Sequence, residues 1–151
     1  DFGGRVDAGE TPYSAALREG GEELTGFLGD NHTLKKLIKK NGGTFKLELN
    51  KYHVHIFYLP YDENLPKYYN LNHDFLWKRM DKTVLNKTKL FEKIEIKWFS
   101  FSEMVKDKKQ FRNFYQDIVD LFDQNKQKIL TFAKNKSKLA HNHNKTQKNH
   151  S

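Results

Sequence analysis

Apolar and polar residues alternate along two neighbouring stretches of the chain. In residues 44–50 the side chains of Phe45, Leu47 and Leu49 fall on one side, and residues 52–59 form a second, mostly apolar run. Alternation is typical of a β-strand, and the short polar break at residues 50–51 suits a tight turn. The pattern therefore predicts an antiparallel hairpin whose second strand is buried on both faces.

Elsewhere apolar residues recur at steps of three or four, which indicates amphipathic helices. Thr11 and Pro12 suit the N-cap and first position of a helix that reaches about Leu24. Asp30 or Asn31 can cap a second helix. This second helix covers residues 33–40, and the further predicted helices cover residues 68–82 and 110–133, with a short helical turn capped by Ser102.

Residues 90–101 return to alternation, with Ile94, Ile96 and Trp98 on one face, and predict a further strand. Strands mixed with helices predict an α+β domain over residues 1–134. Beyond Lys134 the chain consists mainly of Lys, Asn and His and has few apolar residues. Such a segment buries too little apolar surface to order itself, so we expect residues 135–151 to form a disordered basic tail.

The formal net charge of +8 is concentrated at the C-terminal end of the chain. Seven lysines and no acidic residue follow Asp123, so the preceding part is close to neutral. A basic tail attracts polyanions such as RNA without reading their sequence. The length of 151 residues suffices for one domain with a substantial core.

The chain contains no cysteine, which rules out a disulfide partner and fits a reducing compartment such as the cytoplasm. No apolar run approaches the length of a membrane span, so no membrane partner is expected. The first residues, Asp1 and Phe2, lead directly into a glycine pair without a preceding strand pattern.

The most informative stretch is GGRVDAGETPYSAALREGGEELTG, which begins at Gly3. On a helix, Glu19 lies three and four positions before Glu22 and Glu23, so the three carboxylates share one face. A hard divalent cation such as Mg2+ or Mn2+, which prefers oxygen ligands, would relieve their mutual repulsion. The carbonyls of Gly3 and Gly4 can approach the same cation because no side chain obstructs them. The alternative is an acidic, solvated helix face that binds nothing.

This arrangement resembles the Nudix box of diphosphate hydrolases: glycine, five residues, glutamate, seven residues, Arg-Glu, two residues, Glu-Glu. The matching positions are Gly4, Glu10, Arg18, Glu19, Glu22 and Glu23. The resemblance implies that the last three are metal ligands and that Glu19 or a neighbour activates the attacking water. It also implies that Glu10 and Arg18 pair to close the loop onto the helix.

Two positions differ from the pattern of the family. Gly20 stands where the family has a large apolar residue, and Thr25 stands where it has glycine, with Gly26 one place later. A glycine inside a helix costs about 1 kcal/mol relative to alanine. A lost apolar side chain leaves a gap unless another group fills it. We expect these differences to affect the helix more than the metal ligands.

A second resemblance covers residues 90–101, where Glu95-Ile96-Lys97-Trp98-Phe99 is similar to the strand that follows the box. It implies that Glu92 is a further metal ligand or the general base; a surface glutamate at a strand entrance is the alternative. The family fold is an α/β/α sandwich with a mixed sheet, here followed by a long C-terminal helix. The family places strands before the box, so we expect an N-terminally truncated Nudix domain.

An aromatic and basic segment after the hairpin offers candidates for substrate binding. Tyr68, Trp77, Lys78 and Arg79 suit stacking on a base beside phosphates, although for any single ring we prefer a place in the core. The layout of residues 1–134 resembles the Nudix proteins of large cytoplasmic DNA viruses, some of which remove mRNA caps. The resemblance implies hydrolysis of a cap-type diphosphate bridge on capped RNA in a host cytoplasm.

Two alternatives to decapping remain open at this point. The first is a hydrolase of small nucleotide sugars, dinucleotides or inositol pyrophosphates. The second is a catalytically weak RNA-binding member of the same family.

Overall fold

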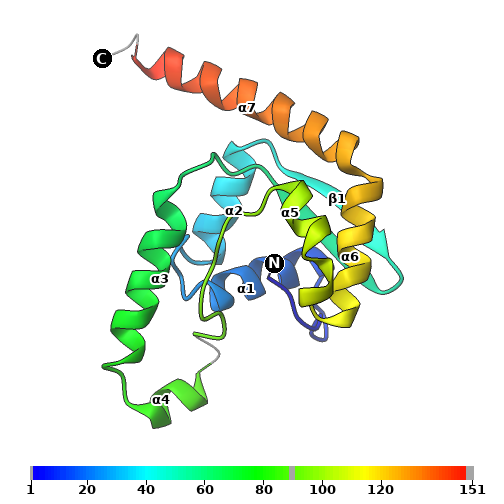
Figure 1. Ribbon diagram of the computed structural model, residues 1–151. Coiled ribbons are helices and arrows are strands. Elements are labelled where there is room, and N and C mark those ends of the chain that lie inside the picture. Colours follow the sequence, from blue (N-terminus) through cyan, green and yellow to red (C-terminus); the bar gives the residue numbers. More distant parts are fainter. Residues whose placement is uncertain (1, 89–90, 149–151) are drawn as a thin grey trace. The chain divides into compact units, whose positions relative to one another are not determined.

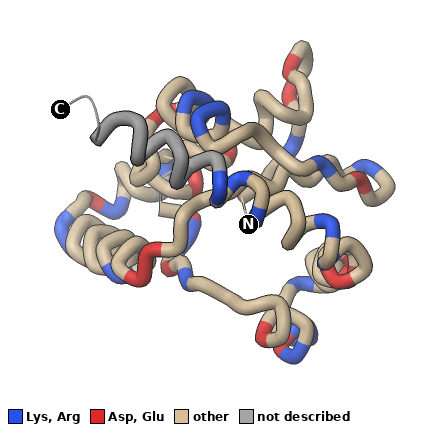
Figure 2. The backbone as a smooth tube through the Cα atoms, turned by 90° about the horizontal axis from the view of Figure 1, so that it is seen from above, with Lys and Arg blue, Asp and Glu red and all other residues tan. Residues whose placement is uncertain are grey.

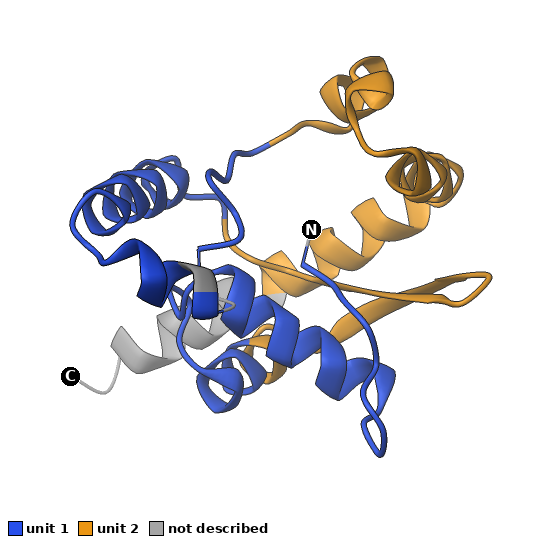
Figure 3. Ribbon diagram, turned by 90° about the horizontal axis from the view of Figure 1, so that it is seen from below, with its two compact units in different colours: residues 1–37, 61–98 blue, residues 38–60, 99–151 orange. Residues whose placement is uncertain are grey.

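The computed structural model describes residues 2–88 and 91–148, and for residues 86 and 139–148 it describes the backbone alone. Over these residues the fold contains seven α-helices, one short 3-10 helix and one two-stranded antiparallel sheet (Figure 1). The predicted α+β class is confirmed at this level. The chain divides into two compact units, residues 1–37 with 61–98 and residues 38–60 with 99–151 (Figure 3).

The first unit is built on helix α1 (Pro12–Glu23), whose start follows the predicted cap. Thr11 Oγ1 accepts the backbone N–H of Ser14 at 3.1 Å, and Ser14 Oγ accepts the N–H of Thr11 at 2.9 Å. This reciprocal pair satisfies two backbone donors that the helix itself leaves unpaired. Ala15 and Leu17 of α1 are buried in the core of the unit.

Helix α1 ends in a Schellman motif in which Thr25 occupies the left-handed position. The N–H groups of Thr25 and Gly26 donate to the carbonyls of Glu22 and Gly21, each at 2.9 Å. Thr25 has a φ of 55°, which glycine adopts without strain and a β-branched residue adopts rarely. Position 25, where the box pattern has glycine, therefore adopts a left-handed backbone in this chain.

Helix α2 (Asn31–Lys40) packs on α1 through Leu34. Asp30 Oδ1 accepts the N–H of Thr33 at 2.8 Å, so Asp30 serves as the cap. Leu34 is buried, and a Cβ added to Gly20 would lie 3.1 Å from Leu34 Cδ2. The gap expected at Gly20 is thus filled by Leu34 from the neighbouring helix.

The helix predicted over residues 68–82 is two helices, α3 (Asn64–Trp77) and α4 (Lys82–Lys87). Asp81 Oδ1 accepts the N–H of Thr83 at 2.7 Å and so begins a new helix after α3 has ended. On the inner side of α3, Tyr69 and His73 are buried. The Tyr69 ring meets the edge of Phe27 with ring centroids 5.5 Å apart.

Residues 91–100 form no strand, which corrects the prediction for residues 90–101; Leu90 lies outside the described residues. Asn70 of α3 supplies the pairing that a neighbouring strand would give. Its Nδ2 donates to the Ile96 carbonyl at 3.1 Å, and its Oδ1 accepts the Ile96 N–H at 2.9 Å. Alternation favours an extended backbone, but a ladder needs a second strand, and a helix side chain takes its place here.

The second unit contains the predicted hairpin, β1 (Thr44–Leu49) and β2 (Tyr52–Phe57). Leu49 pairs with Tyr52 across the two-residue turn, in which Asn50 has a left-handed φ of 54°. No residue of β2 is fully buried, so the prediction of burial on both faces is wrong. A two-stranded sheet leaves an edge of each strand uncovered by a further strand.

Helix α5 (Phe101–Lys106) begins earlier than predicted, because its cap is Ser100 and not Ser102. Ser100 Oγ accepts the N–H of Glu103 at 3.2 Å, and Glu103 Oε2 accepts the N–H of Ser100 at 2.7 Å. Ser100 and Glu103 form a capping box, which is a stronger signal for a helix start than Ser102 alone.

The single helix predicted over residues 110–133 is divided into three elements. These are the 3-10 helix η1 (Lys108–Gln110), α6 (Asn113–Gln124) and α7 (Lys126–Lys148). The side-chain amide of Asn125, through Nδ2, donates to the Leu121 carbonyl at 2.9 Å and thereby ends α6. Phe114 of α6 stacks on Tyr52, and Phe132 of α7 contacts Phe45, so both helices pack on the hairpin.

The backbone of α7 is helical through Lys148, beyond residue 133, where the predicted helix ends. The division into a domain over residues 1–134 and a tail over residues 135–151 stays a prediction, as does the disorder of that tail in solution. Residues 149–151 lie outside the described part of the chain.

Candidate functional site

The Arg18 guanidinium joins the N-terminal loop to α1. Its Nε and one terminal nitrogen donate to the two oxygens of Glu10, each at 3.2 Å, and the same terminal nitrogen donates to the Arg5 carbonyl at 3.0 Å. The hydrogen bonds to Glu10, and then those to Glu19, raise the pKa of the Arg18 guanidinium above its usual value. The structure thus brings Glu10 and Arg18 together as a two-pronged ion pair that holds the loop on the helix.

The carboxylate of Glu19 lies directly against the backbone of Gly4. A Cβ built on Gly4 would overlap Oε1 and Cδ of Glu19, so a glycine is required for this approach. The second terminal nitrogen of Arg18 donates to Glu19 Oε1 at 2.7 Å and lies 3.5 Å from Glu22 Oε2. One positively charged nitrogen therefore bridges the first two of the three predicted metal ligands.

Glu23 is the buried carboxylate of the set, with 4% of its surface exposed. Its Oε2 accepts the N–H of Gly3 at 3.1 Å, and its Oε1 lies 3.1 Å from Lys93 Nζ. Burial raises the pKa of the Glu23 carboxyl, the Lys93 ammonium and the Gly3 N–H oppose this rise, and the charge on Glu19 adds to it. A carboxylate buried to this degree needs a cationic partner, and Lys93 is that partner.

Sequence reasoning missed Lys93, and it missed the residue that places it. The Tyr69 hydroxyl lies 3.2 Å from the Glu23 carbonyl and 3.0 Å from the Lys93 carbonyl, so it links the two backbones. Close by, the N–H of Phe91 donates to Thr25 Oγ1 at 3.3 Å. These partners lie far apart in sequence, so no local pattern indicates them.

Glu92, the predicted further ligand or base, is exposed. Among the described residues, no hydrogen bond or ion pair joins it to the box. Its neighbour Lys93 points to Glu23 instead. The structure therefore brings Glu19, Glu22 and Glu23 to the glycine loop but leaves Glu92 at the surface.

The donor chemistry of the box suits a hard divalent cation. Carboxylate oxygens and glycine carbonyls are ligands that Mg2+ and Mn2+ prefer, and the side chains of Glu19 and Glu23 contact Gly4 and Gly3. Among the side chains that the structure describes, however, no three His, Asp or Glu residues converge closely enough to hold a metal ion. Arg18 pairs with Glu19 and Lys93 pairs with Glu23 instead, so in this structure the carboxylates are neutralised by side-chain cations.

The four predicted substrate-binding residues differ in what they can reach. The Trp77 ring stacks on His73 with ring centroids 5.9 Å apart, and Lys82 Nζ lies 4.3 Å from its centroid. Lys78 pairs with Asp74 at 2.7 Å. Trp77 is therefore packed on its own helix, and Lys78 already has an anionic partner.

The other two substrate candidates are Tyr68 and Arg79, and both are exposed. Tyr68 is 58% exposed on the outer side of α3. The Arg79 guanidinium lies 3.8 Å from the centre of the Phe75 ring, a cation–π pair in which the ring is itself 54% exposed. All four predicted residues are thus exposed, with Trp77 at 40% and the Lys78 side chain at 65%.

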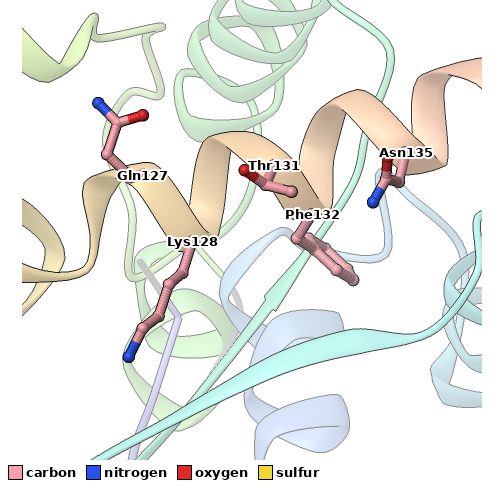
Figure 4. A pocket seen from close by; sticks show the side chains of 5 residues that line it. All are labelled: Gln127, Lys128, Thr131, Phe132 and Asn135. Carbon is pink, nitrogen blue, oxygen red and sulfur yellow. The ribbon is translucent and has the colours of Figure 1, made fainter.

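A depression runs along α7 in the second unit (Figure 4). It is lined by Gln127, Lys128, Thr131, Phe132 and Asn135. None of the predicted site residues contributes to it, and it contains no carboxylate. It therefore does not compete with the box as a candidate metal site.

No family model, no curated protein and no solved structure matches this chain.

Acidic and basic positions are interspersed along the described backbone (Figure 2). None of the described helices combines the length and apolar character that crossing a membrane requires. The functional assignment therefore depends on the residues of the box and on their contacts.

Proposed function

We propose that this chain is a Nudix-type hydrolase that cleaves a nucleoside-diphosphate-linked substrate with the help of Mg2+ or Mn2+. The observation that carries the proposal is the approach of the Glu19 carboxylate to Gly4, in a loop held on α1 by Arg18 and Glu10. On a merely solvated acidic helix face the Glu19 carboxylate would point into solvent and not against the backbone of Gly4. The close approach of Glu19 to Gly4 does suit carboxylates that gather around the glycine loop.

Each residue of the box has a role in this proposal. Glu19, Glu22 and Glu23, with the carbonyls of Gly3 and Gly4, would hold the divalent cation. When bound, the cation neutralises diphosphate charge and lowers the pKa of an attacking water. A carboxylate accepts the proton of that water, for which Glu19 and the exposed Glu92 are the candidates.

The finer fold assignment belongs to the same proposal. An α/β/α sandwich with a mixed sheet would use part of residues 92–98, in the first unit, as one strand. The Asn70 amide already pairs with Ile96 in the manner of a strand neighbour. A further strand beside this segment would provide the ladder that is not formed among the described residues.

The substrate proposed within this class is capped RNA. A cap is a diphosphate-bridged nucleotide on a polyanion, so it calls for an exposed ring and for positive charge. Tyr68 of α3 and Arg79, two residues beyond the end of α3, offer these, and seven lysines follow Asp123 without any acidic residue. Free small diphosphates would make no use of the basic C-terminal end.

The decisive experiment is product analysis with Mn2+, using cap-labelled RNA beside a panel of nucleotide sugars and dinucleotides. The unmodified chain is compared with Glu22→Gln and with the matched control Glu63→Gln, an exposed glutamate that makes no capping hydrogen bond on α3. Release of 7-methylguanosine diphosphate by the unmodified chain and by Glu63→Gln, but not by Glu22→Gln, supports decapping.

Other outcomes of this experiment point elsewhere. Turnover of the small compounds alone identifies a small-molecule hydrolase. RNA binding without any diphosphate product identifies a weak RNA-binding member. Equal activity in the unmodified chain and Glu22→Gln refutes the metal–carboxylate mechanism.

A further inference from the structure

Two side-chain cations neutralise the carboxylates of the box, and they are held in different ways. Arg18 has Glu10 and the Arg5 carbonyl as partners besides Glu19, so it stays anchored when Glu19 turns to another cation. Lys93 Nζ has Glu23 Oε1 as its ion-pair partner, at 3.1 Å. Arg18 therefore belongs to the frame of the loop, whereas Lys93 is an exchangeable counter-ion.

Burial is unequal across the Lys93–Glu23 pair. The Glu23 side chain is 5% exposed, and the Lys93 side chain is 31% exposed. Lys93 thus reaches from the solvent side onto a carboxylate that is otherwise enclosed. A cation that arrives from solvent meets Glu23 Oε1 at the position that the ammonium occupies.

The backbone carbonyl of Lys93 has a hydrogen-bond partner in the core, whereas its side chain reaches Glu23 from the solvent side. The hydroxyl of the buried Tyr69, which is 2% exposed, lies 3.0 Å from the Lys93 carbonyl and 3.2 Å from the Glu23 carbonyl, so its one proton lies between these two acceptors. The Lys93 side chain consists of a flexible four-carbon stem that ends in a compact charge. The ammonium can therefore leave Glu23 by rotation about side-chain bonds, with no movement of the backbone.

We propose that Lys93 is a positioning residue that holds Glu23 in the absence of a divalent cation, and that the cation binds by displacing its ammonium. This inference rests on the proposed metal site. An enclosed carboxylate without a partner is costly, so the Lys93 ammonium offsets the burial of Glu23 and holds its Oε1 in place. The exchange replaces one positive charge with two at the same oxygen. It then leaves the ammonium beside the site, where an anionic diphosphate is expected.

Removing the competitor should strengthen cation binding. Lys93→Met keeps the apolar stem and removes the charge, and we expect its dissociation constant for Mn2+ to fall about tenfold. Electron paramagnetic resonance of unbound Mn2+ at fixed pH and ionic strength measures this constant without substrate. Lys67→Met is the matched control, an exposed lysine of α3 with the same loss of charge, and its affinity should equal that of the unmodified chain.

The direction of this change separates displacement from structural damage, which weakens binding. Lys93→Met should also unfold at a lower temperature without Mn2+, because Glu23 loses its partner, and saturating Mn2+ should recover most of that loss. Mn2+ affinity in Lys93→Met equal to or weaker than that of the unmodified chain overturns the proposal.

A second measurement needs no variant and covers the case in which Lys93→Met does not fold. An amine-reactive ester is applied to the full chain with and without Mn2+, and each lysine is quantified by mass spectrometry. We expect the reactivity of Lys93 to rise several-fold with Mn2+, while that of Lys67 stays constant. Unchanged reactivity of Lys93 under conditions in which Mn2+ is bound overturns displacement.

These results separate the inference from the proposed function. Tighter Mn2+ binding by Lys93→Met without any diphosphate product leaves Lys93 as the counter-ion and refutes the hydrolase. Diphosphate hydrolysis with Lys93 unaffected by Mn2+ supports the hydrolase and refutes the role of Lys93 as the counter-ion. Absence of Mn2+ binding in every variant refutes both.

Discussion

The carboxylate of Glu19 and the backbone of Gly4 are in such close contact that a methyl group at Gly4 has no space. The contact joins a loop residue to a helix residue, and it determines where the carboxylate can lie. The side chain is flexible at that end, so the carboxylate and not the backbone would move if a larger residue replaced Gly4.

Gly4→Ala should therefore impair cation binding more than stability. We expect Mn2+ affinity to fall at least tenfold, because Glu19 is pushed out of the loop, while the free energy of unfolding changes by about 1 kcal/mol. Calorimetric titration with Mn2+ and thermal unfolding measure the two effects. Gly3→Ala is the control, since an added Cβ there meets nothing within 4 Å; equal effects at the two glycines would contradict the role of the contact.

The left-handed backbone at Thr25 predicts a difference between two substitutions. Thr25→Gly and Thr25→Ala both remove the Oγ1 that accepts the Phe91 N–H, but Thr25→Ala keeps a Cβ at a φ of 55°. We expect Thr25→Gly to be more stable than Thr25→Ala by about 1 kcal/mol, because glycine avoids the left-handed penalty. Urea unfolding gives both values, and equal stability would show that this residue does not keep a left-handed φ in solution.

The contact between Gly20 and Leu34 predicts that the apolar residue typical of the box pattern cannot be restored alone. Gly20→Leu should lower the free energy of unfolding by about 1–3 kcal/mol, because its side chain needs the space of Leu34. The double variant Gly20→Leu/Leu34→Ala should be more stable than the sum of the two single changes predicts.

A double-mutant cycle by chemical unfolding checks this coupling. Leu34→Ala alone should cost about 2–5 kcal/mol, since Leu34 is buried. Strict additivity of the two changes would mean that Gly20 and Leu34 do not share one space.

The two-pronged pair of Arg18 with Glu10 predicts that lysine cannot replace Arg18. Arg18→Lys keeps the charge but cannot donate to both oxygens of Glu10 and to the Arg5 carbonyl, so we expect a loss of about 1–2 kcal/mol in stability. Arg79→Lys is the control, because Arg79 lies over an exposed ring and should change stability by less than about 0.5 kcal/mol. Thermal unfolding of both variants measures these changes in stability. An Arg18→Lys variant as stable as the unmodified chain would contradict the role of the two-pronged ion pair with Glu10.

Local chemistry determined a definite part of this protein. The capping pair of Thr11 and Ser14, the cap at Asp30 and the turn at Asn50 each depend on residues within a few positions, and each is found where the sequence places it. The stacking of Glu19, Glu22 and Glu23 along one helix face follows from the helical repeat alone.

Where the sequence was misleading, a competing contact had been overlooked. A capping box moved the start of α5 to Ser100, an amide at Asn125 divided the last helix, and Asn70 paired with a segment that alternation had marked as a strand. Each of these contacts is made by a polar side chain that takes up backbone groups. The spacing of apolar residues gives no information about such hydrogen bonds.

Only the tertiary structure decided how the carboxylates are compensated. Lys93 meets Glu23, Tyr69 holds both of their backbones, and Phe91 donates to Thr25 across a long stretch of chain. The sequence by itself established which oxygens could gather and on which helix. Which cations face them depends on chain segments that only folding brings together, because a buried charge is neutralised by whatever lies nearest in space and not by what lies nearest in sequence.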